Sequence, residues 1–452
     1  MVVEGWLARA AAARPGHTAL QADDGACTYG ELLDAARSGA HELHGRGARR
    51  GERVAIALPG GLGFAQALHA CLFLGSVAVP VDVRAPAREQ EQMSACARVV
   101  VDEPLPLEPR SSRASQPELP GARGHDLDAP AVVMHTSGTS GSPSPVELTY
   151  GNLLWSALGS AAALDLQASE RWLCAMPVCH VGGLSILVRS AIYATTAVVH
   201  ARFEADRALG ALREERITLV SLVATTLARL LDAGLARPPA LRCALTGGGP
   251  VGGALIARAV EAGVPLSLTY GLTEACSQVT TTPVRELARS GPSPGPPLFC
   301  SHVAIASDGE ILVNGPTIAP GAVAADGWLH TQDLGRIDAP GRLHVTGRRS
   351  EVIISGGENV APAEVEAVLE QHPDVLEAAV VGRADGEWGE AVTAHIVARP
   401  GRAPAAKELR EHCAGALAPY KVPREIVLRD RPLPRTPSGK LARAQLKAGR
   451  VG

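Results

Sequence analysis

The sequence predicts an α/β protein: a large N-terminal domain of parallel or mixed sheets with flanking helices, followed by a small α+β C-terminal domain. Strand-like apolar runs alternate with helix-like stretches along most of the chain before residue 300, as in βαβ units. The 452 residues exceed what one ordinary hydrophobic core holds. Beyond Gly347, shorter strand-like and helix-like runs form a unit of the size of a small domain.

Composition excludes several classes of function. The chain has 43 basic and 46 acidic residues, a balance that gives no electrostatic reason to expect nucleic acid or an anionic membrane as a partner. Nine cysteines without a CxxC pair favour a reduced, cytoplasmic compartment without a zinc site. No signal peptide and no stretch long enough to span a bilayer are present, so we expect no membrane insertion.

The first elements form a βαβ unit. Thr28 and Glu31 have the spacing of a capping box and indicate the start of a helix. Residues 53–58 and 76–81 are apolar strand-like runs, and residues 64–74 between them have helical apolar spacing. Such a unit places its two strands parallel in one sheet.

The alternation continues through the middle of the chain. A helix is expected from Leu153 to Leu164, capped near Asn152. Strands and a further helix are then predicted in the following order: strands at 218–223 and 241–245, a helix from about 253 to 262, and a strand at 265–270.

Three loops, 136–145, 246–250 and 271–278, follow predicted strands. Ligands of open α/β sheets bind beyond the carboxyl ends of the strands, so these loops are candidates for one site. The first loop alternates glycines with small hydroxyl residues, which can form a cradle for a phosphate. Taken alone, the same composition also suits a flexible surface loop.

The C-terminal part has its own pattern of elements. Residues 355–357 form a tight glycine turn, and Pro362 suits the first position of a helix. Strands are expected at 377–381 and 392–397, and a helix from about 405 to 417.

Four charged residues are candidates for chemistry on a bound nucleotide. Glu274 follows a strand and could hold Mg²⁺, which binds nucleotides through carboxylates and phosphate oxygens. Asp333 could accept hydrogen bonds from a ribose, and Arg348 could pair with phosphate or ribose. Lys440, in a Thr-Pro-Ser-Gly turn, could reach a phosphate or carboxylate oxygen. Each of the four could equally be an ordinary solvated or capping residue.

Together these stretches resemble the adenylate-forming superfamily, which includes acyl-CoA synthetases, luciferases and adenylation domains of nonribosomal peptide synthesis. Six motifs occur in the superfamily's order over essentially the whole chain, a specific signal where one motif would be weak: Thr136-Ser-Gly-Thr-Ser-Gly141, Tyr270-Gly-Leu-Thr-Glu274, Thr331-Gln-Asp-Leu-Gly335, Gly347-Arg348, Ser355-Gly-Gly-Glu-Asn359 and Pro437-Ser-Gly-Lys440. No Gly-Lys-Ser/Thr follows Gly138 at the Walker A spacing, which disfavours a P-loop NTPase.

The resemblance implies the domains and their roles. An N-terminal domain at 1–348, with a small β-barrel-like part, would hold ATP and the acid, and a mobile C-terminal domain at 349–452 would serve both half-reactions. ATP, Mg²⁺ and CoA are the implied cofactors. A carboxylic acid would be the other small-molecule partner, and a homo-oligomer is possible.

The resemblance also assigns residues. The catalytic residues would be Lys440, Glu274 and Thr273, with Glu274 and Thr139 at the metal. The implied cofactor-binding residues are Thr136, Ser137, Gly138, Thr139, Ser140, Gly141, Gly247, Gly248, Gly249, Pro250, Tyr270, Gly271, Asp333, Arg348, Gly356 and Gly357. Of these, the 136–141 loop would grip the β- and γ-phosphates, and the 355–358 loop would approach the pantetheine of CoA.

Two positions depart from the family pattern. Relatives commonly have basic residues where this chain has Ser142 and Ser144, so its phosphate loop lacks positive charge. At the hinge, many relatives have Asp or Lys where this chain has Ser350, and a serine can still absorb a large backbone rotation.

Within the superfamily, residues 180–190, 221–226, 246–250 and 275–280 are most similar to the branch that activates o-succinylbenzoate for menaquinone biosynthesis. That acid has a second carboxylate, which a cation or hydroxyl donors would recognise. The candidate substrate residues are His180, Arg189, Ser221 and Ser277. Another aryl- or acyl-CoA ligase, a stand-alone adenylation domain and a non-catalytic nucleotide-binding relative remain alternatives.

Overall fold

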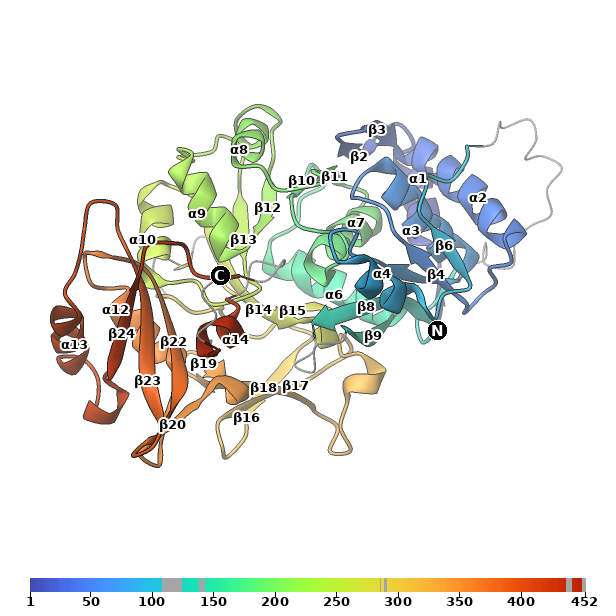
Figure 1. Cartoon of the computed structure of the whole chain (residues 1–452). Helices are drawn as coiled ribbons and strands as arrows, with labels where there is room; N and C mark the ends of the chain where they lie inside the picture. Colours follow the sequence, from blue (N-terminus) through green and yellow to red (C-terminus); the bar gives the residue numbers. More distant parts are fainter. Residues whose placement is uncertain (108–123, 138–142, 285, 288–290, 436–440, 449–452) are drawn as a thin grey trace.

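The computed structural model describes residues 1–107, 124–137, 143–284, 286–287, 291–435 and 441–448. Figure 1 shows two large sheets with helices around them, a small antiparallel sheet below, and a C-terminal unit of strands and helices on one side. The predicted α/β class, with a large N-terminal part and a small α+β C-terminal part, is confirmed.

The first large sheet has five strands in the order β6-β4-β5-β8-β9. All its pairs are parallel except β8 with β9, which form a hairpin. Its strands are β4 (Arg53–Ile56), β5 (Val77–Pro80), β6 (Val99–Val101), β8 (Pro130–Ser137) and β9 (Pro143–Thr149), and the helices in this part of the chain are α1 (Trp6–Ala13), α2 (Tyr29–Gly45), α3 (Leu62–Leu74) and α4 (Ala87–Ser94). The predicted βαβ unit is β4-α3-β5, and the predicted Thr28–Glu31 capping box starts α2.

The second large sheet has eight strands in the order β15-β14-β13-β12-β10-β11-β2-β3. Its central strands are parallel, and one antiparallel strand closes each edge. Its strands are β2 (Thr18–Ala22), β3 (Gly25–Thr28), β10 (Arg171–Cys174), β11 (Thr196–Val199), β12 (Leu219–Leu222), β13 (Cys243–Thr246), β14 (Leu266–Leu272) and β15 (Ser277–Thr281), and the helices along it are α6 (Tyr150–Ala163), α7 (Val181–Tyr193), α8 (Ala205–Glu214), α9 (Ala224–Asp232) and α10 (Gly253–Glu261). A short pair, β1 (Val2–Val3) with β7 (His125–Asp126), lies outside both sheets.

Helices α3 and α7 are buried along almost their whole length. They share one apolar cluster with strands of both large sheets. A helix covered on all sides is expected to be apolar all round, which explains why α3 is mostly apolar, although it also buries Gln66 and His69. On α7 the same burial encloses a charged residue, Arg189.

The start of α6 differs from its prediction. Thr149, not Asn152, is the cap: its hydroxyl accepts from the Asn152 N–H, and the Asn152 side chain accepts from the Thr149 N–H. The helix therefore begins at Tyr150, because this reciprocal pair satisfies the first free backbone donors.

The rest of the chain forms two smaller sheets. The first is antiparallel, with β16 (His302–Ile305), β17 (Glu310–Asn314), β18 (Leu329–Ile337) and β19 (Leu343–Arg348). The C-terminal sheet has β20 (Ile353–Ser355), β21 (Glu358–Val360), β22 (Val375–Asp385), β23 (Gly389–Ala398) and β24 (Glu425–Arg429), with helices α12 (Pro362–Leu369), α13 (Ala406–Ala414) and α14 (Arg443–Lys447). Single 3₁₀ turns are η1 (Thr273–Ala275), η2 (Pro320–Ala322), η3 (Arg349–Glu351) and η4 (Pro419–Lys421).

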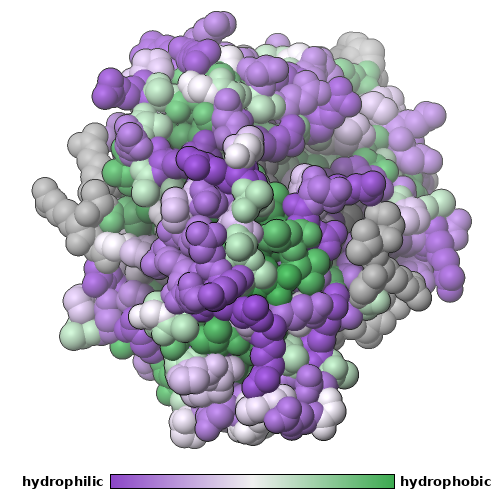
Figure 2. Space-filling view, turned by 60° about the vertical axis from the view of Figure 1, so that its left-hand side comes forward, coloured by the Kyte–Doolittle hydropathy of each residue, from purple (hydrophilic) through white to green (hydrophobic). Residues whose placement is uncertain are grey.

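Within the described ranges, no helix has both the length and the apolar character needed to cross a bilayer. Figure 2 shows a face that is mostly polar, on which apolar side chains gather in a few patches.

Candidate active site

The glycine loop after β13 lies close to the end of β14. A β-carbon on Gly247 would be 2.8 Å from the carbonyl oxygen of Thr269, and Gly248 has a φ of +77°. Both positions therefore require glycine, one for space and one for conformation. The result is a stretch of bare backbone, 247–250, at the carboxyl ends of two parallel strands, where ligands of such sheets bind.

Tyr270, Asp333 and Arg348 meet at one point. The Tyr270 hydroxyl donates to Asp333 Oδ2 at 2.8 Å, and Arg348 Nε lies 3.1 Å from Asp333 Oδ1. The two strands β18 and β19 make this possible, because Asp333 and Arg348 are direct cross-strand partners. Burial, followed by the charge of Asp333, raises the pKa of Tyr270, so its hydroxyl stays a donor.

Glu274 lies in η1, directly after β14, and is half-buried. Its backbone oxygen accepts from the Ala319 N–H at 2.8 Å, which fixes the turn against the small sheet. Cys276 and Ser277 follow with φ values of +52° and +95°, both unusual for residues with a side chain. This sharp turn leaves the carboxylate of Glu274 beside the end of β14, a position suited to Mg²⁺ on a nucleotide.

The phosphate loop lies between two paired strands. Thr136 and Ser144 face each other across the β8–β9 hairpin, and the Thr136 hydroxyl donates to the Ser144 carbonyl at 3.3 Å. Ser137 is the last residue of β8. The candidates Gly138, Thr139, Ser140 and Gly141, together with Ser142, lie outside the described residues.

Lys440 also lies outside the described residues, but the backbone on either side of residues 436–440 is described. Arg435 and Leu441 form an antiparallel bridge. Arg443 then donates to the carboxylates of Glu351 and Glu366, and to the Val380 carbonyl at 3.0 Å. Arg443 is thus an anchor for the backbone that follows Leu441. The sequence contains no local signal for it, because its partners are 63 to 92 positions away.

The glycine turn between β20 and β21 is held by an aromatic ring. Gly356 and Gly357 have φ values of +61° and +84°. A β-carbon on Gly356 would be 2.6 Å from the Trp388 ring, and the Arg424 guanidinium lies 3.8 Å above that ring. The turn is therefore a formed structure with an exposed tip rather than a loose linker.

Arg189 is a buried cation, only 3% exposed. It donates to Gln278 Oε1 and to Ser156 Oγ, both at 2.9 Å, and lies 5.8 Å above the Trp172 ring. Among the described residues no carboxylate pairs with it, and its Nε has no hydrogen-bond partner. Burial lowers the pKa of Arg189, since the charge is costly there.

Two other substrate candidates lie around Arg189. The Trp172 indole donates to Ser221 Oγ at 3.0 Å, so Ser221 joins the same cluster. Ser277 precedes Gln278, and the Ser156 hydroxyl that accepts from Arg189 donates to the Cys276 carbonyl at 2.6 Å. The cluster therefore connects the buried cation to the turn after Glu274.

His180 is separate from that cluster. It is the N-cap of α7, nine residues before Arg189, which corresponds to about 14 Å along the helix. Asp82, Cys179 and His180 place ligand atoms within 4.8 Å of one another. However, Arg84 already supplies a cation, with two 2.7 Å hydrogen bonds to Asp82, and burial raises the pKa of the Cys179 thiol to about 12. We therefore assign no metal site to this cluster.

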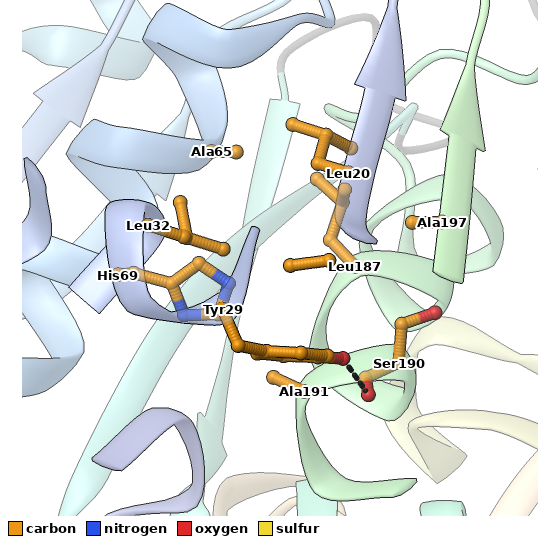
Figure 3. A pocket seen from close by; sticks show the side chains of 10 residues that line it. Leu20, Tyr29, Leu32, Ala65, His69, Leu187, Ser190, Ala191 and Ala197 are labelled. Atoms are coloured by element: carbon orange, nitrogen blue, oxygen red, sulfur yellow. Dashed lines mark hydrogen bonds between the residues drawn. The ribbon is translucent and has the colours of Figure 1, made fainter. Parts of the chain in front are cut away.

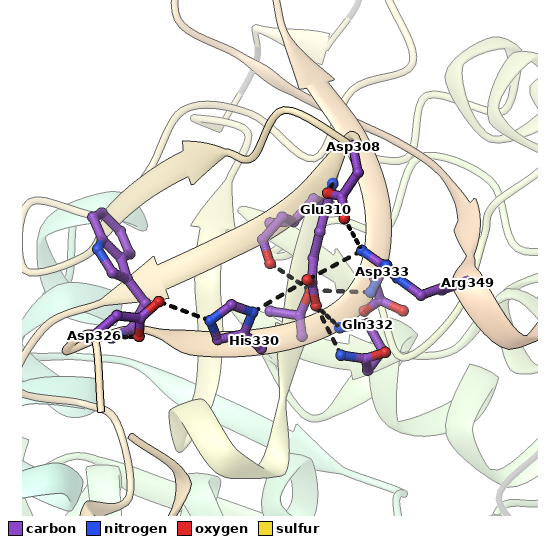
Figure 4. Close-up of polar contacts among 10 residues, drawn as sticks. Asp308, Glu310, Asp326, His330, Gln332, Asp333 and Arg349 are labelled. Atoms are coloured by element: carbon purple, nitrogen blue, oxygen red, sulfur yellow. Dashed lines mark hydrogen bonds and ion pairs between the residues drawn. The ribbon is translucent and has the colours of Figure 1, made fainter. Parts of the chain in front are cut away.

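Glu310 is a further buried charged residue, and no motif in the sequence indicates its role. It accepts from the Gln332 N–H and side chain at 2.9 and 3.0 Å, and Arg349 Nη2 and His330 Nδ1 both lie 3.2 Å from its other oxygen. Figure 4 shows these groups converging on it. Gln332, which has a φ of +61°, directly precedes Asp333. By accepting from Gln332, Glu310 therefore helps to fix the backbone beside Asp333.

Comparison with known proteins agrees with this geometry. The family model described as AMP-binding enzyme matches residues 7–322, and the AMP-binding enzyme C-terminal domain matches residues 364–440. The chain belongs to the AMP-binding enzyme family. The predicted membership in the adenylate-forming superfamily is thereby confirmed.

Relatives within the AMP-binding enzymes support the predicted branch. A 2-succinylbenzoate–CoA ligase of Bacillus subtilis is 37% identical over 99% of this chain and 98% of the relative. The Bacillus subtilis o-succinylbenzoate CoA synthetase in complex with its acyl-adenylate intermediate has a TM-score of 0.88 at 35% identity, covering 100% of this chain and 99% of that one. A double mutant of the same synthetase with a product analogue covers 99% of both chains but has a TM-score of only 0.72.

Proposed function

We propose that this AMP-binding enzyme is an acid–thiol ligase for o-succinylbenzoate in menaquinone biosynthesis. It joins the aliphatic carboxylate to the α-phosphate of ATP with release of pyrophosphate, and then transfers the acyl group from AMP to the thiol of CoA. The observation that carries the choice of acid is Arg189, a buried cation without a carboxylate partner among the described residues. The free carboxylate of the acid is the group that this cation would bind.

For the nucleotide, we assign the adenine to the backbone of 247–250 beside Tyr270, and the ribose to Asp333 and Arg348. Asp333 is paired with Arg348, and its carboxylate oxygens can accept hydrogen bonds from ribose hydroxyls. Thr136 and Ser137 begin the loop proposed for the β- and γ-phosphates, in which Ser142 and Ser144 supply no positive charge.

Glu274 and Thr139 are the residues proposed to hold Mg²⁺, and Thr273 to contact the α-phosphate. A half-buried carboxylate beside a strand end is the kind of ligand that Mg²⁺ takes on a nucleotide. When bound, the ion neutralises charge on the phosphates. Lys440 is proposed to stabilise the charge that develops on the α-phosphate, which needs alignment and charge relief rather than a base.

The acid would lie between the nucleotide and Arg189. Ser221 and Ser277 are proposed to contact its aromatic carboxylate, and His180 to form the opposite wall of the acyl pocket. The cluster of Arg189 with Gln278 and Ser156 supports this assignment, because it leads directly to the turn after Glu274.

The arrangement of the two domains supports assignment to the first half-reaction. The acyl-adenylate complex has a TM-score of 0.88 and the product-analogue complex 0.72, although both are 35% identical to this chain. We infer a boundary between 1–348 and 349–452, at which the C-terminal domain turns between half-reactions and brings Gly356 and Gly357 to the pantetheine of CoA. All nine cysteines are free, which fits the proposed cytoplasmic location, and a homo-oligomer remains a possible state.

The test is pyrophosphate release from ATP and Mg²⁺ with a panel of acids. o-Succinylbenzoate should give the highest kcat/KM, and benzoate without the succinyl chain should give little. Release with other aryl acids but not with o-succinylbenzoate would favour another aryl-CoA ligase. Acyl transfer to a carrier protein but not to CoA would favour a stand-alone adenylation domain, and no release with any acid would favour a non-catalytic relative.

A further inference from the structure

Helix α10, which follows the glycine loop, has no side chain that caps its first turn. Gly252 is the N-cap of α10, and no side chain hydrogen-bonds there from within the helix. Three residues lie between this end and Gly248 in the proposed adenine loop. The free N–H groups of a first helical turn carry partial positive charge and favour a carboxylate nearby.

That carboxylate comes from the C-terminal domain. Glu370, the C-cap residue of α12, contacts Gly252: a β-carbon built on Gly252 would overlap Oε2 and lie 3.3 Å from the carboxyl carbon. The neighbouring Gly253 has nothing within 4 Å of such a β-carbon. Figure 1 shows α12 beside α10, in agreement with the contact between Glu370 and Gly252.

The Glu370 carboxylate also accepts a hydrogen bond from the Ala378 backbone N–H, within the C-terminal part of the chain. Among the described residues it forms no ion pair, and burial, followed by the charge of Glu366, raises its pKa to about 7. The nearby Glu366 is bound by Arg443, while Glu377 and Arg435 pair with each other at 3.3 Å. The end of α10 is thus a contact that joins this carboxylate to the N-terminal part of the chain.

We propose that Glu370 is a positioning residue for the first half-reaction, holding the C-terminal domain against the start of α10 beside the adenine loop. This inference rests on the proposed function, in which the C-terminal domain turns between half-reactions. In the present arrangement the contact keeps α12 against the start of α10, next to the 247–250 loop. After the domain turns, Glu370 leaves Gly252 and the contact has no further effect.

The experiment measures the two half-reactions separately in four variants of the full chain. Glu370→Ala should lower the rate of pyrophosphate release by about two- to thirtyfold, the range for a charge at a helix end. Gly252→Ala should give a similar loss, because its methyl group displaces the carboxylate. The rate of pyrophosphate release in the double variant should be no lower than in either single variant. Gly253→Ala is the matched control, with the same chemical change one residue away and no expected loss.

Thioester formation from preformed acyl-adenylate should stay within twofold of wild type in all four variants. Equal losses in both half-reactions, or additive losses in the double variant, would overturn the proposal. Hydrogen exchange of a peptide covering 251–256 gives a readout without substrate and should be faster in Glu370→Ala. A wild type inactive with o-succinylbenzoate would reject the proposed function alone, whereas unchanged exchange would reject the Glu370 contact alone.

Discussion

The Tyr270 hydroxyl donates a 2.8 Å hydrogen bond to Asp333, although 63 positions separate the two residues in the chain. Tyr270 lies on β14 of the eight-stranded sheet, next to its edge strand β15, and Asp333 lies on the small antiparallel sheet. The bond therefore joins two sheets at the place where we propose that adenosine binds. It holds Asp333 with one oxygen toward Tyr270 and the other toward Arg348.

Replacing Asp333 with Asn should raise the KM for ATP. The amide keeps the size of the side chain but loses the charge that pairs with Arg348 and half of its acceptor capacity. A charge-assisted contact of this kind corresponds to roughly tenfold or more in kcat/KM. Steady-state pyrophosphate release at varied ATP concentration measures this KM. Tyr270→Phe is the control, since it removes the hydrogen bond to Asp333 and keeps the ring. An unchanged KM for ATP in Asp333→Asn would contradict the ribose assignment.

Replacing Arg189 with Lys should affect the acid and not the nucleotide. Lysine keeps the charge but lacks the planar fork that reaches Gln278, Ser156 and a carboxylate together. The KM for o-succinylbenzoate should rise by about tenfold or more, with the KM for ATP within twofold. A melting temperature close to wild type is needed as a control, because the site is buried. Parallel increases in both KM values would speak against a role in acid recognition.

Lys440→Ala should separate the half-reactions. Loss of one preorganised donor to developing charge typically costs about 10²–10³ in rate, so acyl-adenylate formation should fall by that factor. Thioester formation from preformed adenylate should be spared. Rapid mixing with chemically prepared adenylate measures the second step directly. An equal loss in both steps would rule out the proposed role of Lys440.

Stability should fall below pH 6.5 because of two buried histidines. Burial lowers the pKa of His69 and of His125 to about 4 in the folded chain, against a usual value of 6.5. Below pH 6.5 the unfolded chain binds more protons than the folded one, so this contribution is complete above pH 6.5 and is lost as the pH falls toward 4. Each histidine should cost on the order of 2 kcal/mol at pH 5 relative to pH 7.

Figure 3 shows His69 in a small pocket with Leu20, Leu32 and Leu187, where the Tyr29 hydroxyl donates to the Ser190 carbonyl at 2.6 Å. These mostly apolar surroundings disfavour a charged imidazole. Urea unfolding at several pH values measures the effect. His69→Leu, similar in size and unable to titrate, should flatten the slope between pH 6.5 and 5. A slope unchanged by that variant would show that His69 contributes nothing to it.

Local signals in the sequence predicted much of this structure. The Thr28–Glu31 capping box, the βαβ unit and the glycine turn at 356–357 each depend on residues close in the chain, and each is present. Strand β9 was not foreseen, because Pro143, Ser144 and Pro145 have the composition of a loop. Pairing with β8 overrides that local preference.

The charged contacts of the candidate site could not be predicted in the same way. The pattern around Arg189 does not indicate that this side chain is buried, because its burial follows only from the packing of α7 between the sheets. Glu310 supports Gln332 from 22 positions away, and Glu370 contacts Gly252 from another domain. No periodicity in the sequence carries such information, since tertiary packing brings these charges together.

The most direct test of the central claim follows o-succinylbenzoate through a single turnover with mass spectrometry. With ATP and Mg²⁺ but no CoA, the chain should form o-succinylbenzoyl-AMP and one equivalent of pyrophosphate. Addition of CoA should then convert the adenylate to the thioester with release of AMP. Absence of the adenylate from a folded chain that binds ATP would contradict the account.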